Sequence, residues 1–213
     1  NSVANVLKVL RNQNIISNYY SVVIQKYVPV FSGMGGGTSN AFFLAKYLTK
    51  NKINKKLLNI FDKKIGSDFK LFFYKQGFLK SLQSIKSFST KHRLFFLIIY
   101  PNVKSSTQYI YSRVKKFSLK DKYNFIRIKD TNKFIEFLVD KNNDLQSIVE
   151  KQHPIIKELI KEIKQKKGCH YSRMTGSGSA CYGVFQSERL AITALNRLRI
   201  KYPKIWLSVA KTI

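Results

Sequence analysis

The chain has 213 residues, of which 44% are hydrophobic and 14% aromatic, and it carries a formal net charge of +28. These numbers predict a globular protein with enough apolar side chains for one large domain or two small ones. The longest apolar run, Leu94–Tyr100, is too short to span a bilayer, and no secretory leader pattern opens the sequence. We therefore expect a cytoplasmic protein with no membrane partner.

The positive charge is distributed along the whole chain, with short lysine clusters at residues 50–56, 63–64, 115–116 and 161–167. A charge of this size is typical of nucleic-acid binding. The chain is equally rich in Asn, Ile, Phe and Tyr, whose codons, like those of Lys, are rich in A and T. We favour base composition over a nucleic-acid partner as the cause, and we expect strong attraction of phosphorylated ligands.

Cysteines and histidines show none of the spacings typical of metal sites or catalytic triads. Cys169 and Cys181 are isolated, and His92, His153 and His170 are scattered. We expect neither a disulfide framework nor a zinc site.

Apolar periodicity indicates several elements in chain order. Helices are predicted at residues 3–10, 40–50, 55–63, 155–163 and 190–198. Strands are predicted at residues 21–24 with 28–31, at 94–100 and at 205–209, and residues 107–114 are a short helix or an extended segment. Asn143 and Asp144 are predicted as caps of a helix that opens at Leu145. The polar stretch 81–91 is the best candidate for a domain junction.

Four glycines within five positions, Gly33, Gly35, Gly36 and Gly37, stand between a predicted strand and a predicted helix. Without Cβ atoms, backbone amides can close on an anion at the positive end of the helix. A P-loop requires lysine after the last glycine, and a dinucleotide-binding fingerprint that starts at Gly33 requires glycine at that position. Thr38 stands there, so neither motif is present. The alternative is a tight turn with a helix cap, for which one or two glycines suffice. We therefore predict an anion site.

Two further motifs are weak when taken alone. Asp68 stands between a glycine and the strand-like run 69–73, a position more typical of a turn aspartate. Residues 176–178 form a second glycine-rich turn between two strand-like runs, as many hairpins do.

The combination of these motifs is more specific. The stretches Gly-Met-Gly-Gly-Gly-Thr-Ser-Asn-Ala, Gly-Ser-Asp, Asn-Asp-Leu and Met-Thr-Gly-Ser-Gly stand at residues 33–41, 66–68, 143–145 and 174–178. In this order they resemble motifs of the GHMP kinases over nearly the whole chain. Within that family, the similarity is to the branch that phosphorylates cytidine diphosphate methylerythritol in the non-mevalonate isoprenoid pathway.

The resemblance implies an α+β fold of GHMP kinase architecture. Residues 1–85 would be the remainder of an ATP-binding, ribosomal-S5-like domain, and residues 86–213 a ferredoxin-like C-terminal domain. It also implies an ATP-dependent phosphotransferase that uses ATP and Mg²⁺ and acts on a small molecule, cytidine diphosphate methylerythritol.

Site residues also follow from the resemblance. Asp68 would be the catalytic base that accepts the proton of the substrate hydroxyl. The ATP phosphates would contact a loop made of Pro29, Gly33, Gly35, Gly36, Gly37, Thr38 and Ser39, with Thr38 or Ser39 near the metal. The substrate would contact Tyr111, Gly176, Ser177 and Gly178, with Tyr111 stacking on cytosine.

The sequence also departs from the family pattern. It has no Pro-Ala-Lys-hydrophobic-Asn-Leu motif, which in the family contributes the lysine that pairs with the catalytic aspartate. Phe42 replaces a small residue, and Lys70 and Ser106 replace prolines. We therefore expect a fragment, a split gene product or a decaying copy. The alternatives to an active kinase are a non-catalytic remnant with weak nucleotide binding and a basic RNA-binding module.

Overall fold

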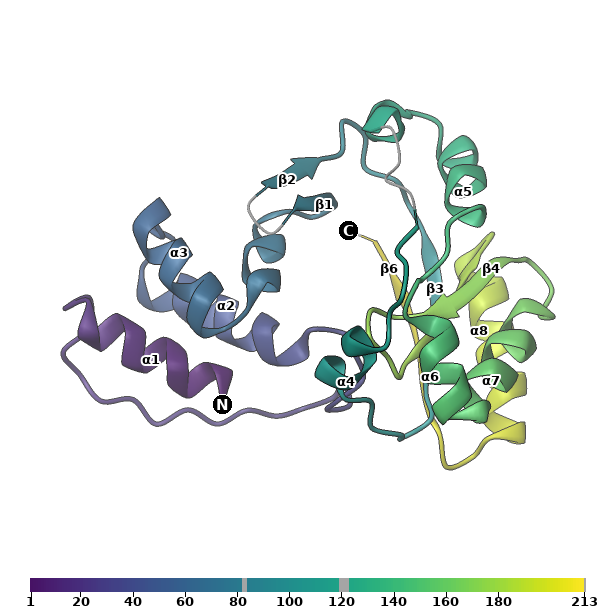
Figure 1. Cartoon of the computed structure of the whole chain (residues 1–213), viewed down its shortest axis with the longest axis horizontal. Coiled ribbons are helices and arrows are strands. Elements are labelled where there is room, and N and C mark those ends of the chain that lie inside the picture. Colours follow the sequence, from purple (N-terminus) through teal and green to yellow (C-terminus); the bar gives the residue numbers. More distant parts are fainter. Residues whose placement is uncertain (82–83, 119–122, 213) are drawn as a thin grey trace. The chain divides into compact units, whose positions relative to one another are not determined.

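The computed structural model describes residues 1–81, 84–118 and 123–212 (Figure 1). Contacts between residues divide the chain into two compact units. Unit 1 comprises residues 1–30 and 35–87, and unit 2 comprises residues 31–34 and 88–213. The first glycine loop is therefore divided, because residues 31–34 pack with unit 2 and the glycines from Gly35 onward pack with unit 1. The domain boundary after residue 85 and the ribosomal-S5-like identity of the first domain stay predictions.

Unit 1 consists of helices and one hairpin. Its described elements are α1 (Ser2–Asn12), α2 (Gly36–Leu48), α3 (Lys55–Lys64), the 3-10 helix η1 (Ser67–Phe73), β1 (Gly77–Ser81) and β2 (Ser84–Ser87). The three predicted helices are confirmed, although α2 begins four residues earlier than predicted, inside the glycine run. Phe42 lies at the centre of the core, with its ring centroid 5.4 Å from that of Phe69 and 5.8 Å from that of Phe72.

The strand predicted at residues 21–24 and 28–31 is wrong. This stretch is an irregular connection that pairs with none of the described strands. A strand forms only where a neighbouring strand accepts and donates its backbone hydrogen bonds, whatever its side-chain pattern favours. The side chains of Val23 and Tyr27 stay in solvent, with exposed fractions of 92% and 74%.

The interpretation of residues 69–73 as strand-like is also wrong, because these residues belong to η1. A short apolar run without alternation does not distinguish a strand from a helical segment. Phe69 is fully buried against the rings of Phe42 and Phe61. Asp68 consequently lies in the first turn of a 3-10 helix and is not followed by a strand.

Unit 2 is built on an antiparallel sheet with strand order β4-β5-β3-β6. Its described elements are β3 (Phe95–Tyr100), α4 (Thr107–Ser112), the 3-10 helix η2 (Tyr123–Arg127), α5 (Thr131–Val139), α6 (Gln146–Gln152), α7 (Pro154–Lys164), β4 (Cys169–Met174), β5 (Cys181–Phe185), α8 (Glu188–Lys201) and β6 (Trp206–Lys211). Helices lie between the first and second strands and between the third and fourth. This is the β-α-β-β-α-β arrangement of the ferredoxin-like fold, so the α+β prediction is confirmed.

Two long helices cover the sheet of unit 2. Helix α7 packs on β4 and β5, and α8 packs on β3 and β6 (Figure 1). A Cβ at Gly183 of β5 would lie 2.3 Å from Cγ2 of Ile163, so the glycine permits the close approach of α7. The predicted helices and strands at residues 94–100, 155–163, 190–198 and 205–209 are confirmed, and residues 107–114 contain the short helix α4.

Some elements of the structure were not predicted. The hairpin β1–β2 lies partly in the polar stretch taken as a junction, and α5 had no predicted counterpart. Helix α6 begins at Gln146 with Leu145 as its N-cap, so Asn143 and Asp144 precede the helix instead of capping it. Within the described ranges, no helix is both long and apolar enough to cross a membrane.

Candidate functional site

The glycines of the first loop fall into two kinds according to their surroundings. Gly33 and Gly35 have positive φ angles of 72° and 67°, which favour glycine. A Cβ at Gly33 would also lie 2.5 Å from the carbonyl oxygen of Gly178. By contrast, a Cβ at Gly36 would meet nothing within 4 Å, and one at Gly37 only Oγ of Ser2 at 3.6 Å. The fold therefore requires glycine at the first two positions but not at Gly36 and Gly37.

The N-terminus of α2 has unused hydrogen-bond donors. The first backbone bond of the helix runs from Ser39 N to Gly35 O at 2.9 Å, and the N-cap contributes no side-chain acceptor. Across the described chain, no hydrogen bond occupies the amides of Gly36, Gly37 or Thr38. These amides lie at the positive end of the helix dipole, and amides in this position bind phosphate groups.

Asp68 is exposed and lies in the element that packs against α2. The ring of Phe72 in η1 approaches this helix, with Cζ 3.6 Å from the position a Cβ would take at Gly35. No ion pair to Asp68 is seen among the described residues, whereas Lys70 pairs with Asp62 at 2.7 Å. A carboxylate without a cationic partner in the fold remains available to a ligand.

Not every hollow of unit 1 belongs to this arrangement. A hollow of about 770 Å³ lies on α3 and η1 and is lined by residues that include Lys55, Asp62 and Lys70. Neither Asp68 nor any residue of the glycine loop lines it.

The second glycine-rich turn, in unit 2, is held by the side chain of Asn143. Its Nδ2 donates to the carbonyl oxygens of Met174 at 3.1 Å and Gly176 at 2.8 Å, and its Oδ1 accepts from Leu145 N at 3.0 Å. Oε1 of Gln146 accepts from Met174 N at 3.0 Å. Sequence reasoning took Asn143 for a helix cap, and its Asn-Asp-Leu motif was the only signal of this role.

Residues 31–34 form hydrogen bonds with the same turn. The carbonyl oxygen of Ser32 accepts from Ala180 N at 3.2 Å and from Oγ1 of Thr175 at 3.0 Å. Gly33 therefore packs against the second turn. Pro29 lies in the irregular connection of unit 1. These contacts support a structural role for Gly33, and its predicted contact with ATP phosphates stays a prediction.

A pocket of about 460 Å³ lies beside the second turn in unit 2. It is lined by Tyr111, Phe117, Asn142, Asn143, Asp144, Leu145, Arg173, Met174, Thr175, Gly176 and Tyr182. We name it the acceptor pocket. Burial raises the pKa of Tyr182, so its hydroxyl stays protonated at neutral pH and can donate a hydrogen bond.

The four predicted substrate residues occupy different positions around this turn. Tyr111, with 54% of its surface exposed, and Gly176 line the acceptor pocket. Ser177 lies outside the lining, and its Oγ forms a hydrogen bond with Oγ1 of Thr107 at 2.9 Å. Gly178 is buried, and a Cβ there would lie 2.8 Å from Sδ of Met174. Arg173 and Tyr182 line the pocket but carried no sequence signal.

Comparison with protein families and sequences identifies relatives over the whole chain. The family described as GHMP kinases C terminal matches residues 126–204. The 4-diphosphocytidyl-2-C-methyl-D-erythritol kinase of Pelagibacter ubique is 32% identical over 222 residues, covering 100% of this chain and 76% of that protein. The protein of the same name from Wolbachia pipientis wMel is 29% identical and covers 97% of this chain and 73% of that protein.

Solved structures agree in fold. A crystal structure of 4-(cytidine 5'-diphospho)-2C-methyl-D-erythritol kinase superposes with a TM-score of 0.64 at 20% identity, covering 87% of this chain and 68% of that chain. A homoserine kinase from Cytophaga hutchinsonii superposes with a TM-score of 0.73 at 15% identity, covering 100% of this chain and 76% of that chain. The Pelagibacter relative matches over the whole chain, and the C-terminal family matches as well. The chain therefore belongs to the 4-diphosphocytidyl-2-C-methyl-D-erythritol kinase family of GHMP kinases.

Proposed function

We propose that this chain transfers the γ-phosphoryl group of ATP to a hydroxyl of 4-diphosphocytidyl-2-C-methyl-D-erythritol, a step of non-mevalonate isoprenoid synthesis. Membership of the family supports this proposal. The structural observation that carries it is the start of α2, where Gly36 and Gly37 leave open space and three amides have no acceptor within the described chain. Glycine inside a helix costs roughly 1 kcal/mol relative to alanine, so a ligand is a better reason for these two glycines than the fold.

The amides of Gly36, Gly37 and Thr38 would bind the phosphates of ATP. Phosphoryl transfer consists mainly of positioning and charge neutralisation, which fixed backbone donors supply. Thr38 and Ser39 carry the hydroxyls nearest to these amides in sequence, and Mg²⁺ prefers oxygen ligands together with nucleotide phosphates. The metal would neutralise phosphate charge.

Asp68 would act as the general base. Its carboxylate is exposed and is held on an element that packs against α2. It would accept the proton of the attacking hydroxyl, so that the oxygen gains nucleophilicity as its bond to phosphorus forms.

The acceptor pocket of unit 2 would hold the cytidine end of the substrate. Tyr111 offers an exposed aromatic face for stacking, and Tyr182 offers a protonated hydroxyl. Phosphorylated groups would be attracted by Arg173 in the same lining.

The test measures ADP release with this substrate for the full chain and for Asp68→Asn. We expect kcat to fall by about 10²-fold to 10⁴-fold in the variant, while calorimetry shows unchanged ATP affinity. Asp62→Asn is the matched control, because it removes a carboxylate of the same unit that pairs with Lys70. This control is expected to retain turnover.

Full activity in Asp68→Asn would exclude the base assignment. ATP binding without any turnover in the unmodified protein would overturn the kinase proposal in favour of a non-catalytic nucleotide-binding form.

A further inference from the structure

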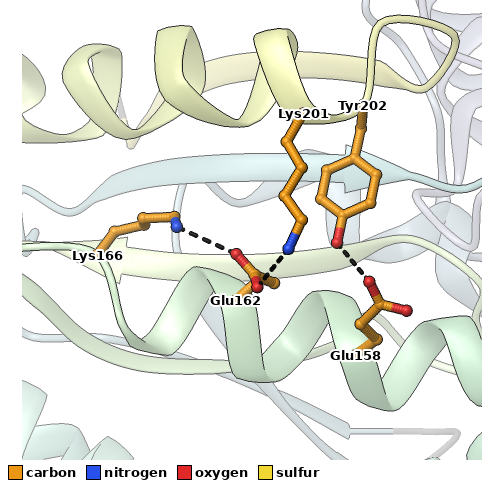
Figure 2. A network of polar contacts seen from close by, with 5 residues as sticks. All are labelled: Glu158, Glu162, Lys166, Lys201 and Tyr202. Atoms are coloured by element: carbon orange, nitrogen blue, oxygen red, sulfur yellow. Dashed lines mark hydrogen bonds and ion pairs between the residues drawn. The ribbon is translucent and has the colours of Figure 1, made fainter.

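Helix α7 presents three chemically different faces. Ile156, Leu159 and Ile163 are fully buried in the core of unit 2. Glu158 and Glu162 form a second face, which is directed toward α8 (Figure 2). The charged residues of the remaining face are all lysines.

The acidic face is already compensated. The hydroxyl of Tyr202 donates to Oε1 of Glu158 at 2.6 Å (Figure 2). Glu162 accepts from Nζ of Lys201 at 2.7 Å and from Nζ of Lys166 at 3.1 Å. Lys201, followed by Lys166, holds the pKa of the Glu162 carboxyl below its usual value. These carboxylates are therefore engaged by their partners on one side of α7.

The lysine face consists of Lys157, Lys161 and Lys164. Successive helical residues turn by about 100°, so these three positions lie within about 60° of one another. They line a groove of about 880 Å³. Among the described residues, its cationic lining side chains are Lys116, Lys141, Lys157, Lys161, Lys164 and Arg173, and its lining carboxylates are Asp144 and Glu150. We name it the α7 groove.

Lys164 and Arg173 make hydrogen bonds in the groove, but neither forms an ion pair with a described residue. Nζ of Lys164 donates to the carbonyl oxygen of His170 at 2.6 Å, and Arg173 donates to the carbonyl oxygens of Leu138 and Val139. These acceptors are neutral. In the described part of the chain, Lys157 and Lys161 form no ion pair.

The two carboxylates of the groove have neutral partners of their own. Asp144 accepts from the backbone N and the hydroxyl of Ser118, and Oε1 of Glu150 accepts from Nε2 of Gln146 at 2.8 Å. A base-composition bias would scatter lysines over every exposed face. Their segregation on α7, on a different side of the helix from Glu158 and Glu162, indicates a surface organised for anions.

The α7 groove adjoins the acceptor pocket. The two hollows share Asn142, Asn143, Asp144 and Arg173 as lining residues. The described lining of the groove has six cationic side chains and two carboxylates, so its charge is positive on balance. A cleft with an excess of one sign of charge focuses the electric field and raises the local concentration of a ligand of opposite charge. An anion drawn into the groove would therefore arrive beside the second glycine-rich turn.

We propose that the lysine face of α7 collects the nucleoside diphosphate group of the substrate and delivers it to the acceptor pocket. This role rests on the proposed function, because it assumes that the acceptor pocket takes a cytidine diphosphate. Lys157 and Lys161 act here by long-range attraction and have no contact with the reacting atoms.

The experiment uses cytidine 5'-diphosphate as the probe and calorimetry as the readout, so it does not require turnover. The variant is Lys157→Glu with Lys161→Glu. The matched control is Arg199→Glu with Lys204→Glu, which changes the net charge equally at two exposed residues outside the groove lining. Each protein is titrated at about 0.01 M salt, where the Debye length is about 30 Å, and at about 1 M salt, where it is about 3 Å.

At low salt we expect the groove variant to bind the probe about tenfold more weakly than the unmodified protein, at the lower end of the range of electrostatic focusing. The control should change by less than about twofold, and the difference should vanish at high salt. Equal losses in both variants, no loss, or a loss that persists at high salt would each overturn the proposal. Absence of kinase turnover with the expected salt-dependent binding would contradict only the proposed function.

Discussion

The two kinds of glycine in the first loop predict opposite effects of alanine. In Gly33→Ala, the positive φ costs about 1–2 kcal/mol, and a Cβ 2.5 Å from the Gly178 carbonyl oxygen forces a shift that costs roughly another 1–3 kcal/mol. The variant should therefore lose about 2–5 kcal/mol of unfolding free energy. Gly36→Ala meets open space in a helix, so it should gain about 0.4–1 kcal/mol.

The assay pairs urea unfolding with calorimetric titration of ATP. Gly36→Ala should bind ATP about tenfold more weakly, a difference of about 1.4 kcal/mol, because its methyl group enters the space assigned to phosphate. Hydrogen exchange at Ala180 N, which donates to Ser32 O, should accelerate in Gly33→Ala. The reasoning is refuted if Gly33→Ala changes stability by less than about 0.5 kcal/mol. It is also refuted if Gly36→Ala retains full ATP affinity.

Two further substitutions test the contacts of unit 2. Asn143→Ala removes the donors to Met174 O and Gly176 O and the acceptor of Leu145 N, so it should cost about 2–3 kcal/mol in thermal unfolding and raise KM for the substrate. Asn143→Asp keeps the acceptor but loses the donors, and recovery of the unmodified KM in that variant would contradict a positioning role. Glu162→Gln should cost roughly 0.5–1 kcal/mol at pH 7. Lys201 and Lys166 lower the pKa of Glu162, so this stabilisation is present above the ordinary carboxyl pKa and is lost as the pH falls through the lowered one. Unfolding curves of the two proteins should therefore converge as the pH falls below the lowered pKa of Glu162, and a gap of constant size would refute the ion-pair explanation.

Sequence periodicity predicted the elements whose apolar faces repeat regularly. In α7, the buried residues Ile156, Leu159 and Ile163 follow helical spacing, and this pattern alone locates the helix. The run Phe69–Phe73 has no such period, and it became a 3-10 helix because Phe69 is buried against Phe42 and Phe61. The strand expected at residues 28–31 needed a pairing partner, which a local pattern does not reveal.

The candidate site shows the same limit. The glycine motifs and Asp68 stand out in the sequence because they resemble a family pattern. The bonds that hold the second turn join residues far apart in the chain, such as Thr175 with Ser32 and Ser177 with Thr107. No short-range signal encodes such pairs, so the clamp formed by Asn143 emerged only from the structure.

Because residues 31–34 pack with unit 2, no single truncation point separates the two units. A shortened polypeptide that starts at residue 88 would omit Ser32, whose carbonyl accepts from both Ala180 N and Oγ1 of Thr175. The excised half would therefore carry its glycine-rich turn without two of its anchors. The roles of the chain's residues should therefore be tested with point variants of the intact polypeptide and not with separately expressed halves.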